Sequence, residues 1–321
     1  MSLASFLKLV EIQTKLASVI PFFLGTSYAL YHFDRFNFKN FILMFFSLLC
    51  FDMATTAINN YIDYKKARKT HGYNYEIHNA IVQYNLKEST VLGTIIILIG
   101  LAILFGFFLY LNTSLLVLFL GVISFLVGIL YTFGPIPISR IPLGEMVSGF
   151  FMGGIIPFLA AYVHIWDANV ISLTYVQGRL EGSLDLVEGI SLFLFALPSI
   201  GGIANIMLAN NTCDIEDDIE NKRYTVPIFI GRHQALRLFR WIYYMIYINV
   251  ILLLMLKIIP WTGLLILLTF IPVKRHIEQF IIQQTKKDTF VLAVKNFALI
   301  SGSQVVAMLV ALFFRWIFAF I

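Results

Sequence analysis

The chain has 321 residues, of which 59% are hydrophobic and only 13% are charged, and its mean hydropathy is +0.84. Ordinary soluble domains carry about 25% charged residues, so the composition excludes a soluble globule of this size. Apolar residues run along the whole chain, which also excludes a soluble domain held by a single anchor. The formal charge of +5 comes with no basic stripe outside the loops, so we expect no nucleic-acid partner.

Long stretches without charge predict helices that cross a lipid bilayer. Residues 89–139 contain no Asp, Glu, Lys or Arg, which is enough for two crossings of about 20 residues each. A β-barrel has alternating strands in place of such blocks, whereas helices satisfy every backbone group in lipid. We therefore predict an all-α, polytopic transmembrane bundle, a single domain over residues 1–321, around a central cavity. Its nine predicted spans cover 12–32, 40–62, 90–111, 114–133, 143–165, 189–212, 241–257, 258–273 and 296–319.

The basic residues indicate which way the chain crosses the bilayer. With nine spans and the N-terminus inside, 18 of the 23 Lys and Arg residues fall on the cytoplasmic side, as the positive-inside rule requires. The loop between the fifth and sixth spans then lies outside. It carries Asp167, Glu181, Asp185 and Glu188 against Arg179 alone. This arrangement predicts an integral membrane protein.

A short polar motif, N-N-x-x-D, occurs twice at matching places. One copy ends the second span and the other ends the sixth; their polar residues are Asn59, Asn60, Asp63, Asn210, Asn211 and Asp214. Four crossings separate the two copies, so we expect both at one membrane face, where they can converge on one cavity as a repeat.

Five carboxylates crowd into seven residues from the second copy onward. They are Asp214, Glu216, Asp217, Asp218 and Glu220. If the segment is helical, Asp214 and Asp218 share one face, and hard oxygen ligands suit Mg²⁺, which is held by one or two carboxylates plus substrate phosphates. Lys222 and Arg223 follow and offer positive charge to a diphosphate. The alternative is an acidic, solvated loop.

Two acids near the first copy are further candidates. Asp63 ends the second span beside a basic stretch, residues 65–69, which alternatively serves only as a topology signal. Asp52 lies inside the apolar span, where an ionisable side chain is expensive and suggests function. The alternative for Asp52 is a structural residue that is hydrogen-bonded to Thr55 or Thr56.

Three separated stretches resemble the UbiA-type intramembrane prenyltransferases, most closely the branch that prenylates 1,4-dihydroxy-2-naphthoate for menaquinone. Residues 59–64 (NNYIDY) resemble the family's N-D-x-x-D loop. Residues 131–137 (YTFGPIP), followed by Gly144 and Glu145, resemble that branch's Y-T-x-G-P-x-P and G-E signature. Residues 210–225 resemble the second aspartate motif with its basic residue and Thr. The family plan likewise has nine helices, with these motifs after the second and the sixth.

The resemblance implies transfer of a polyprenyl group from polyprenyl diphosphate to an aromatic acid acceptor, with Mg²⁺ as cofactor. It also implies a bacterial-type cell membrane, with active-site loops in the cytoplasm. For 1,4-dihydroxy-2-naphthoate the product is a demethylmenaquinone, with release of diphosphate and CO₂. The implied catalytic residues are Asp63, Asp214, Asp218 and Glu145. The implied metal ligands are Asp63, Asp214, Asp218, Asn59 and Asn210. The implied substrate-binding residues are Asn59, Asn60, Arg140, Asn210, Asn211, Lys222, Arg223 and Tyr131. Glu145 acts on the acceptor in this interpretation, or alternatively is a structural carboxylate at a helix start.

One departure from the family pattern concerns the metal. Asn60 stands where the first motif normally has Asp, so Asp63 is the anionic ligand there and Asn60→Asp is expected to lower the Mg²⁺ requirement. The alternatives are a prenyltransferase with another aromatic acceptor, an ion-coupled transporter with paired polar helix ends, and a binding protein without catalysis. A transporter would gather its charges at the midplane rather than at one face.

Overall fold

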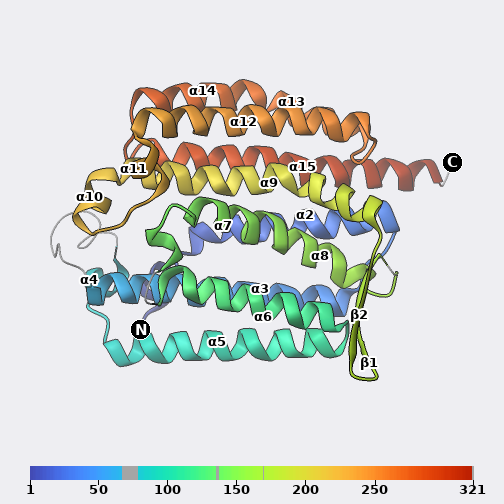
Figure 1. The fold of residues 1–321 in the computed structure, drawn as a ribbon, viewed down its shortest axis with the longest axis horizontal. Helices are drawn as coiled ribbons and strands as arrows, with labels where there is room; N and C mark the ends of the chain where they lie inside the picture. Colours follow the sequence, from blue (N-terminus) through green and yellow to red (C-terminus); the bar gives the residue numbers. More distant parts are fainter. Residues whose placement is uncertain (67–78, 135–136, 169, 320–321) are drawn as a thin grey trace.

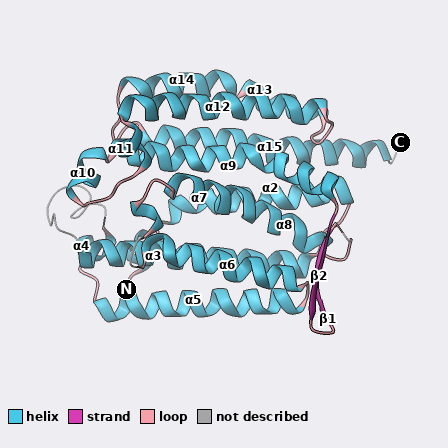
Figure 2. Cartoon of the chain, in the orientation of Figure 1, coloured by secondary structure: helices cyan, strands magenta, loops and turns pink. Residues whose placement is uncertain are grey.

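The computed structural model describes residues 1–66, 79–134, 137–168 and 170–319, which form a bundle of long helices lying side by side (Figure 1). Nearly all of this part of the chain is helical, apart from loops and one two-stranded hairpin (Figure 2). The predicted polytopic helical bundle is confirmed.

Eight segments of the described chain are long and apolar enough to cross a membrane. They are η1 with α2 (Ile12–Lys15 and Leu16–Phe33), α3 (Phe38–Lys66), α5 (Glu88–Leu111), α6 (Leu115–Thr132), α7 with η4 and α8 (Gly144–Phe150, Phe151–Ile155 and Ile156–Ile165), α9 (Leu186–Cys213), α12 (Arg232–Met255) and α15 (Phe290–Ala319). Short helices join them: α1 (Leu3–Leu9), α4 (Ala80–Gln83), η3 (Ile138–Arg140), α10 (Ile215–Glu220) and α11 (Val226–Ile230). Eight of the nine predicted spans therefore have helices of the expected length.

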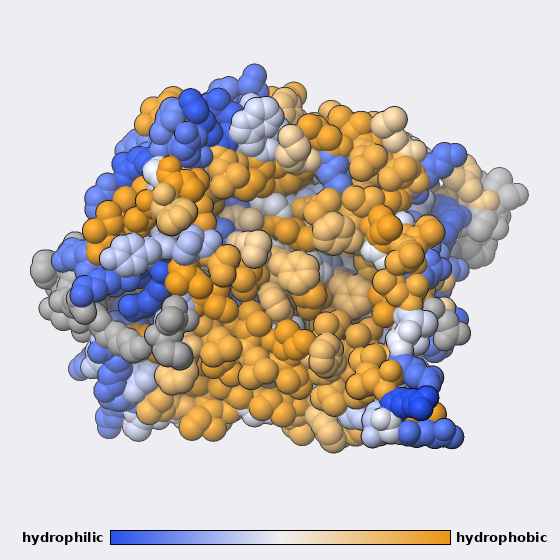
Figure 3. Space-filling model, viewed as in Figure 1, coloured by the Kyte–Doolittle hydropathy of each residue, from blue (hydrophilic) through white to orange (hydrophobic). Residues whose placement is uncertain are grey.

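The outer surface suits a bilayer. Figure 3 shows a broad apolar band across the middle of the molecule, with hydrophilic side chains gathered toward the two ends. Large hydrophobic side chains of α5 and α6, such as Ile96, Phe107 and Phe119, are exposed. A soluble protein rarely exposes so large a contiguous apolar surface, so the chain is an integral membrane protein.

The predicted span 258–273 differs in the structure. It contains the turn η5 (Trp261–Gly263) and the short helix α13 (Leu264–Leu268), and a second helix, α14, runs from Phe270 to Ile282. Pro272 explains the break, because it has no N–H to donate to the Leu268 carbonyl and its ring clashes with that carbonyl. Together α13 and α14 run back beside α12 toward the end of the bundle where α10 lies (Figure 1).

The predicted outer loop between the fifth and sixth spans contains an antiparallel hairpin. Its strands are β1 (Ile171–Val176) and β2 (Arg179–Leu184), with Ile171 opposite Leu184. Gln177 and Gly178 have φ of 48° and 80°, the conformation of the two-residue turns that fit the strand twist. This hairpin lies at the end of the bundle away from α10 (Figure 1).

A close contact between η4 and α9 positions α7. A Cβ added to Gly153 would lie 2.5 Å from the Ile200 Cα, so only glycine lets η4 approach α9 this closely. Pro157 cannot donate to the Gly153 carbonyl, and the wider turn of η4 accommodates the lost bond. The contact holds α7 along α9 and so brings Glu145 beside the end of α9.

Candidate active site

The two polar motifs lie at one end of the bundle. Helix α3 carries the first copy in its last turns and α9 carries the second in its last turn, and both helices end at the end of the bundle where α10 lies (Figure 1). The prediction that the two copies lie at the same end of the bundle is confirmed.

Asp214 marks a bend between two helices. It is the C-cap residue of α9 and the N-cap residue of α10. The Asp218 N–H donates to the Asp214 carbonyl over 2.7 Å, so the two acids lie one helical turn apart as predicted. Their side chains nevertheless have different partners.

Asp214 shares a cation with the second motif's first amide. The Lys286 Nζ donates to the Asn210 Oδ1 over 2.6 Å and forms an ion pair with the Asp214 Oδ2. The side chains of Lys286 and Asp214 are 24% and 14% exposed. Two oxygens proposed as metal ligands therefore converge on one positive group.

Asp218 is buried at the base of α10. Its Oδ1 lies 3.3 Å from the Arg223 Nε, and the Thr225 hydroxyl donates to its Oδ2 over 3.4 Å. Burial raises the pKa of Asp218 to about 6, and the nearby Arg223 guanidinium opposes this rise. The Arg223 Nη2 also donates to the Ser139 carbonyl over 3.4 Å, which ties the Asp218 loop to the segment before α7.

Arg140 and Lys222 lie on the same two segments. The Tyr224 N–H donates to the Arg140 carbonyl over 2.9 Å. Lys222 is exposed, with φ of 56°. Both are placed at the end of the bundle that carries the second motif.

Glu145 is joined to the second motif through one oxygen. The Asn211 Nδ2 donates to the Glu145 Oε1 over 2.8 Å. The Glu145 Oε2 is buried and has no hydrogen-bond partner within the described part of the chain. A buried polar atom of this kind is costly unless a ligand or water satisfies it. Tyr131 lies nearby, where its hydroxyl accepts a hydrogen bond from Ser148 over 3.0 Å.

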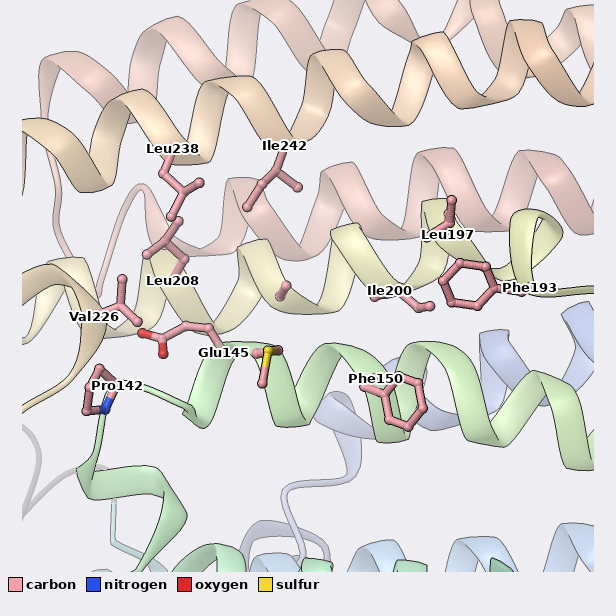
Figure 4. A pocket seen from close by; sticks show the side chains of 12 residues that line it. Pro142, Glu145, Phe150, Phe193, Leu197, Ile200, Leu208, Val226, Leu238 and Ile242 are labelled. Carbon is pink, nitrogen blue, oxygen red and sulfur yellow. The ribbon is translucent and has the colours of Figure 1, made fainter. Parts of the chain in front are cut away.

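An apolar groove of about 370 Å³ begins at Glu145. Its walls come from α7, α9 and α12, and Figure 4 shows the Glu145 carboxylate between Pro142 and Val226. Phe150 and Phe193 line its far part and are themselves exposed, so the groove reaches the apolar outer surface. Glu145 is the one ionisable side chain among the residues that line this groove in the described structure.

The first motif is arranged differently from the second. The Asn59 Oδ1 accepts a hydrogen bond from Thr132 at the end of α6, and Asp63 is exposed in the last turns of α3. The Asn60 amide is buried and turns to the N-terminal segment, where it donates to the Leu9 carbonyl over 3.1 Å and to the Glu11 Oε1 over 3.2 Å. Asn60 therefore has a structural contact where the family pattern has an acid.

Asp52 is satisfied within the bundle. The Lys15 Nζ lies 2.7 Å from its Oδ1, and the Ser18 hydroxyl donates to its Oδ2 over 2.5 Å. The Thr56 hydroxyl donates to the Asp52 carbonyl over 2.9 Å. These contacts favour the structural interpretation, with Lys15 as the partner that sequence reasoning did not identify.

The basic stretch beside Asp63 is only partly described. Lys65 forms an ion pair of 2.7 Å with the Glu88 Oε1 at the start of α5, while residues 67–69 lie outside the described residues. This pair joins two spans across the loop that follows the first motif.

The donor set at this end fits Mg²⁺. Among the residues that the structure describes, no three His, Cys, Asp or Glu side chains form a ready-made cluster. Mg²⁺ does not require one, because it keeps several waters and is held by one or two carboxylates plus substrate phosphates. The side-chain oxygens of Asp214 and Asn210 already converge on one positive group, the Lys286 ammonium.

Known proteins resemble the chain over most of its length. The 1,4-dihydroxy-2-naphthoate octaprenyltransferase of Bacillus subtilis (strain 168) is 29% identical over 231 residues, covering 72% of this chain and 67% of that protein. A UbiA homologue from Archaeoglobus fulgidus bound to GPP and Mg²⁺ superposes with a TM-score of 0.63 at 11% identity, covering 96% and 99% of the two chains. An apo UbiA homologue from Aeropyrum pernix K1 gives a TM-score of 0.67 at 15% identity, covering 92% and 98%.

The two solved structures are similar in fold, and the sequence match defines the family. That match to the UbiA prenyltransferase family covers residues 18–297. It includes both polar motifs, Glu145 and the groove that starts beside it. Because it spans most of the chain and every part of the site just described, the chain belongs to the UbiA prenyltransferase family.

Proposed function

We propose that the chain is an Mg²⁺-dependent aromatic prenyltransferase that moves a polyprenyl group from its diphosphate to 1,4-dihydroxy-2-naphthoate. The observation that carries this proposal is Glu145, which lines the apolar groove: one of its oxygens is bound by Asn211 of the second motif, and the other is buried without a hydrogen-bond partner in the described part of the chain. A charged diphosphate end and an apolar acceptor slot would then adjoin. The relative from Bacillus subtilis carries the name of this activity.

The diphosphate would bind where the second motif gathers charge. Asp214 and Asn210 would hold Mg²⁺ with water and phosphate oxygens, and Asp218 and Asp63 are proposed to complete the ligand set. Bound Mg²⁺ would neutralise the charge that develops on the leaving diphosphate. Arg223, Lys222 and Arg140 would bind the remaining phosphate oxygens, because charge-assisted hydrogen bonds from Lys and Arg suit phosphate.

The acceptor would lie in the groove, with a ring hydroxyl donating to the Glu145 Oε2. The volume of about 370 Å³ is within the range of roughly 300–1,000 Å³ that small-molecule sites occupy. Its apolar walls would exclude water from the reacting carbon. Glu145 would thus orient the ring, and Asn211 would orient Glu145.

The proposed reaction breaks one C–O bond and forms one C–C bond. The electron pair of the prenyl C1–O bond leaves with the diphosphate, and the aromatic carbon that bears the acceptor's carboxylate supplies the pair for the new bond to C1. Loss of CO₂ returns an electron pair to the ring and restores its aromaticity. We propose that the diphosphate loops face the cytoplasm of a bacterial-type membrane, with residues 1–321 acting as one unit.

Two alternatives make different demands on the chain. An ion-coupled transporter needs charged groups at the midplane, whereas Asp214 and Asp218 belong to α10 and its N-cap and Asp63 to the last turns of α3, which lie at one end of the bundle (Figure 1). A different aromatic acceptor would use the same diphosphate site and the same groove. Only substrate competition separates that alternative from the naphthoate proposal.

The test supplies purified protein with Mg²⁺, one polyprenyl diphosphate and equal amounts of 1,4-dihydroxy-2-naphthoate and 4-hydroxybenzoate. We expect pyrophosphate release and a prenylated, decarboxylated naphthalene product, with little prenylated hydroxybenzoate. A preference for 4-hydroxybenzoate would contradict the acceptor assignment. Absence of prenyl transfer to either acid would contradict the proposed function.

A further inference from the structure

A turn near the C-terminus delivers one lysine to the second motif. Lys286 lies between α14 and α15, far from residues 210–214 in sequence, and nothing in its local sequence distinguishes it from the neighbouring Lys287. Because α13 and α14 run back along α12 (Figure 1), this turn returns to the end of the bundle where the motif lies. The fold therefore brings Lys286 to Asp214.

The turn that carries Lys286 is held by several hydrogen bonds. The Thr285 N–H donates to the Thr289 hydroxyl over 2.8 Å, and the Phe290 N–H donates to the Thr285 carbonyl over 3.0 Å. Gln284 donates to the Phe280 carbonyl over 2.7 Å and so closes the end of α14. The backbone at Lys286 is thus fixed, and the long side chain alone decides where the ammonium lies.

The ammonium contacts both side-chain oxygens that the proposed function assigns to Mg²⁺. The Lys286 Nζ lies 2.6 Å from the Asn210 Oδ1 and is paired with the Asp214 Oδ2, the two oxygens proposed above as Mg²⁺ ligands. Four further carboxylates follow Asp214 within six residues, so an uncompensated Asp214 would be repelled by its neighbours. The Lys286 ammonium compensates the Asp214 charge, as Arg223 and Arg232 compensate Asp218 and Glu216.

We propose that Lys286 is a tethered counter-ion that holds the metal position of the second motif. In the metal-free protein its ammonium binds Asp214 and Asn210, and when Mg²⁺ arrives with the diphosphate it gives up these oxygens and turns to a phosphate oxygen. Lysine suits this task because it is a compact charge on a flexible stem with three rotatable donors. The inference rests on the proposed diphosphate site but makes its own demand, which is competition between Lys286 and Mg²⁺.

This competition has a measurable size. A ligand binds more weakly in proportion to the fraction of protein in which its site is available. If Lys286 covers Asp214 in most molecules, its removal should tighten the apparent Mg²⁺ affinity by about fivefold or more. Loss of a merely structural contact would lower stability equally at every Mg²⁺ concentration.

The experiment follows thermal unfolding of the detergent-purified full chain against Mg²⁺ concentration, without prenyl diphosphate. The variants are Lys286→Met, which keeps the length but removes the charge, Lys286→Arg, and the matched control Lys287→Met in the same turn, where the side chain is exposed. In EDTA we expect Lys286→Met to unfold at a lower temperature than wild type. With Mg²⁺ the loss should be recovered, and the half-maximal Mg²⁺ concentration should fall by about fivefold. Lys287→Met should match wild type, and Lys286→Arg should stay near wild type in EDTA.

An unchanged or raised half-maximal Mg²⁺ concentration in Lys286→Met would overturn the proposal, as would a loss of stability that Mg²⁺ does not recover. Absence of any Mg²⁺ effect in wild type and variant would overturn it too. The measurement needs no turnover, so it separates two failures. A protein that transfers no prenyl group but shows the Mg²⁺ shift keeps the Lys286 assignment, whereas an active protein without the shift loses only that assignment.

Discussion

Asn211 donates a hydrogen bond to Glu145 over 2.8 Å and thereby joins the last turn of α9 to the first turn of α7. On its other side, the Asn211 Oδ1 accepts from the Asn210 Nδ2 over 3.4 Å, and Asn210 in turn accepts from Lys286. A chain of hydrogen bonds thus runs from the proposed diphosphate site to the proposed acceptor carboxylate. A substitution at one end of this chain can therefore alter the position of the side chain at the other end.

Glu145→Gln tests the acceptor end of this chain. The variant keeps the shape of the side chain but replaces the charged acceptor with a neutral amide, and hydrogen bonds to charged groups are worth about 1.5–3 kcal/mol. We expect kcat/KM for the aromatic acid to fall by roughly 10- to 100-fold, while the KM for the polyprenyl diphosphate changes little. Steady-state kinetics with each substrate varied in turn measures both. An equal loss for both substrates would argue that Glu145 holds the fold.

Asp214→Asn and Asp218→Asn test the diphosphate end. Each removes one of the proposed anionic metal ligands, so we expect prenyl transfer to fall below about a tenth of wild type, with the folded protein intact in detergent. Glu216→Gln is the matched control, because it removes a carboxylate from the same cluster whose side chain is 73% exposed and paired with Arg232. If both Asn variants retained more than a tenth of the wild-type rate, the assignment of this site would fail.

Asn60→Asp tests the contact between the first motif and the N-terminal segment. A carboxylate there would face the Leu9 carbonyl and the Glu11 carboxylate, both of which accept from the present amide. We expect a loss of about 2 kcal/mol or more in the free energy of unfolding and no decrease in the Mg²⁺ requirement, in contrast to the expectation from sequence.

The second variant in this test is Asn60→Asp combined with Glu11→Gln. The Gln amide can donate to the new carboxylate, so part of the lost stability should return. Denaturant titration in detergent measures both variants. Full stability in Asn60→Asp together with a lower half-maximal Mg²⁺ concentration would show that position 60 faces the metal.

Cysteine labelling tests the orientation of the bundle. The hairpin strand β2 and the segment after α10 lie at opposite ends (Figure 1). In a background with Cys50 and Cys213 replaced by Ala, a membrane-impermeant reagent on intact cells should label Ser183→Cys and leave Asn221→Cys unlabelled. After the cells are opened, both should react. Labelling of Asn221→Cys on intact cells would place the diphosphate site outside.

Helices could be predicted from sequence because the bilayer imposes a simple rule on composition. Charge-free blocks of sufficient length identified eight spans that the structure bears out. The rule failed at 258–273, where the helix is interrupted between α13 and α14 one turn before Pro272, and at the hairpin, where the turn at Gln177 and Gly178 depends on local backbone conformation. Composition alone predicts neither the helix break nor the hairpin turn.

Part of the candidate site could be predicted from the sequence and part could not. Its motif residues were visible because each motif is local, whereas Lys286 and Lys15 act through partners tens of residues away. Nothing in the sequence around Asn60 indicates that its amide turns to Leu9. Such pairings depend on how helices pack, and a single sequence carries no direct record of that packing.

The buried pair between Lys15 and Asp52 has a consequence for how the chain enters the membrane. Lys15 lies at the start of the first span with its side chain 5% exposed, and its partner is supplied by the next span. Until α3 is present, the Lys15 ammonium of a lone first span must stay in contact with water or lipid headgroups. We therefore expect the first two spans to insert stably only as a pair, so that a chain cut after Phe33 integrates poorly while the same fragment with Lys15→Leu integrates well.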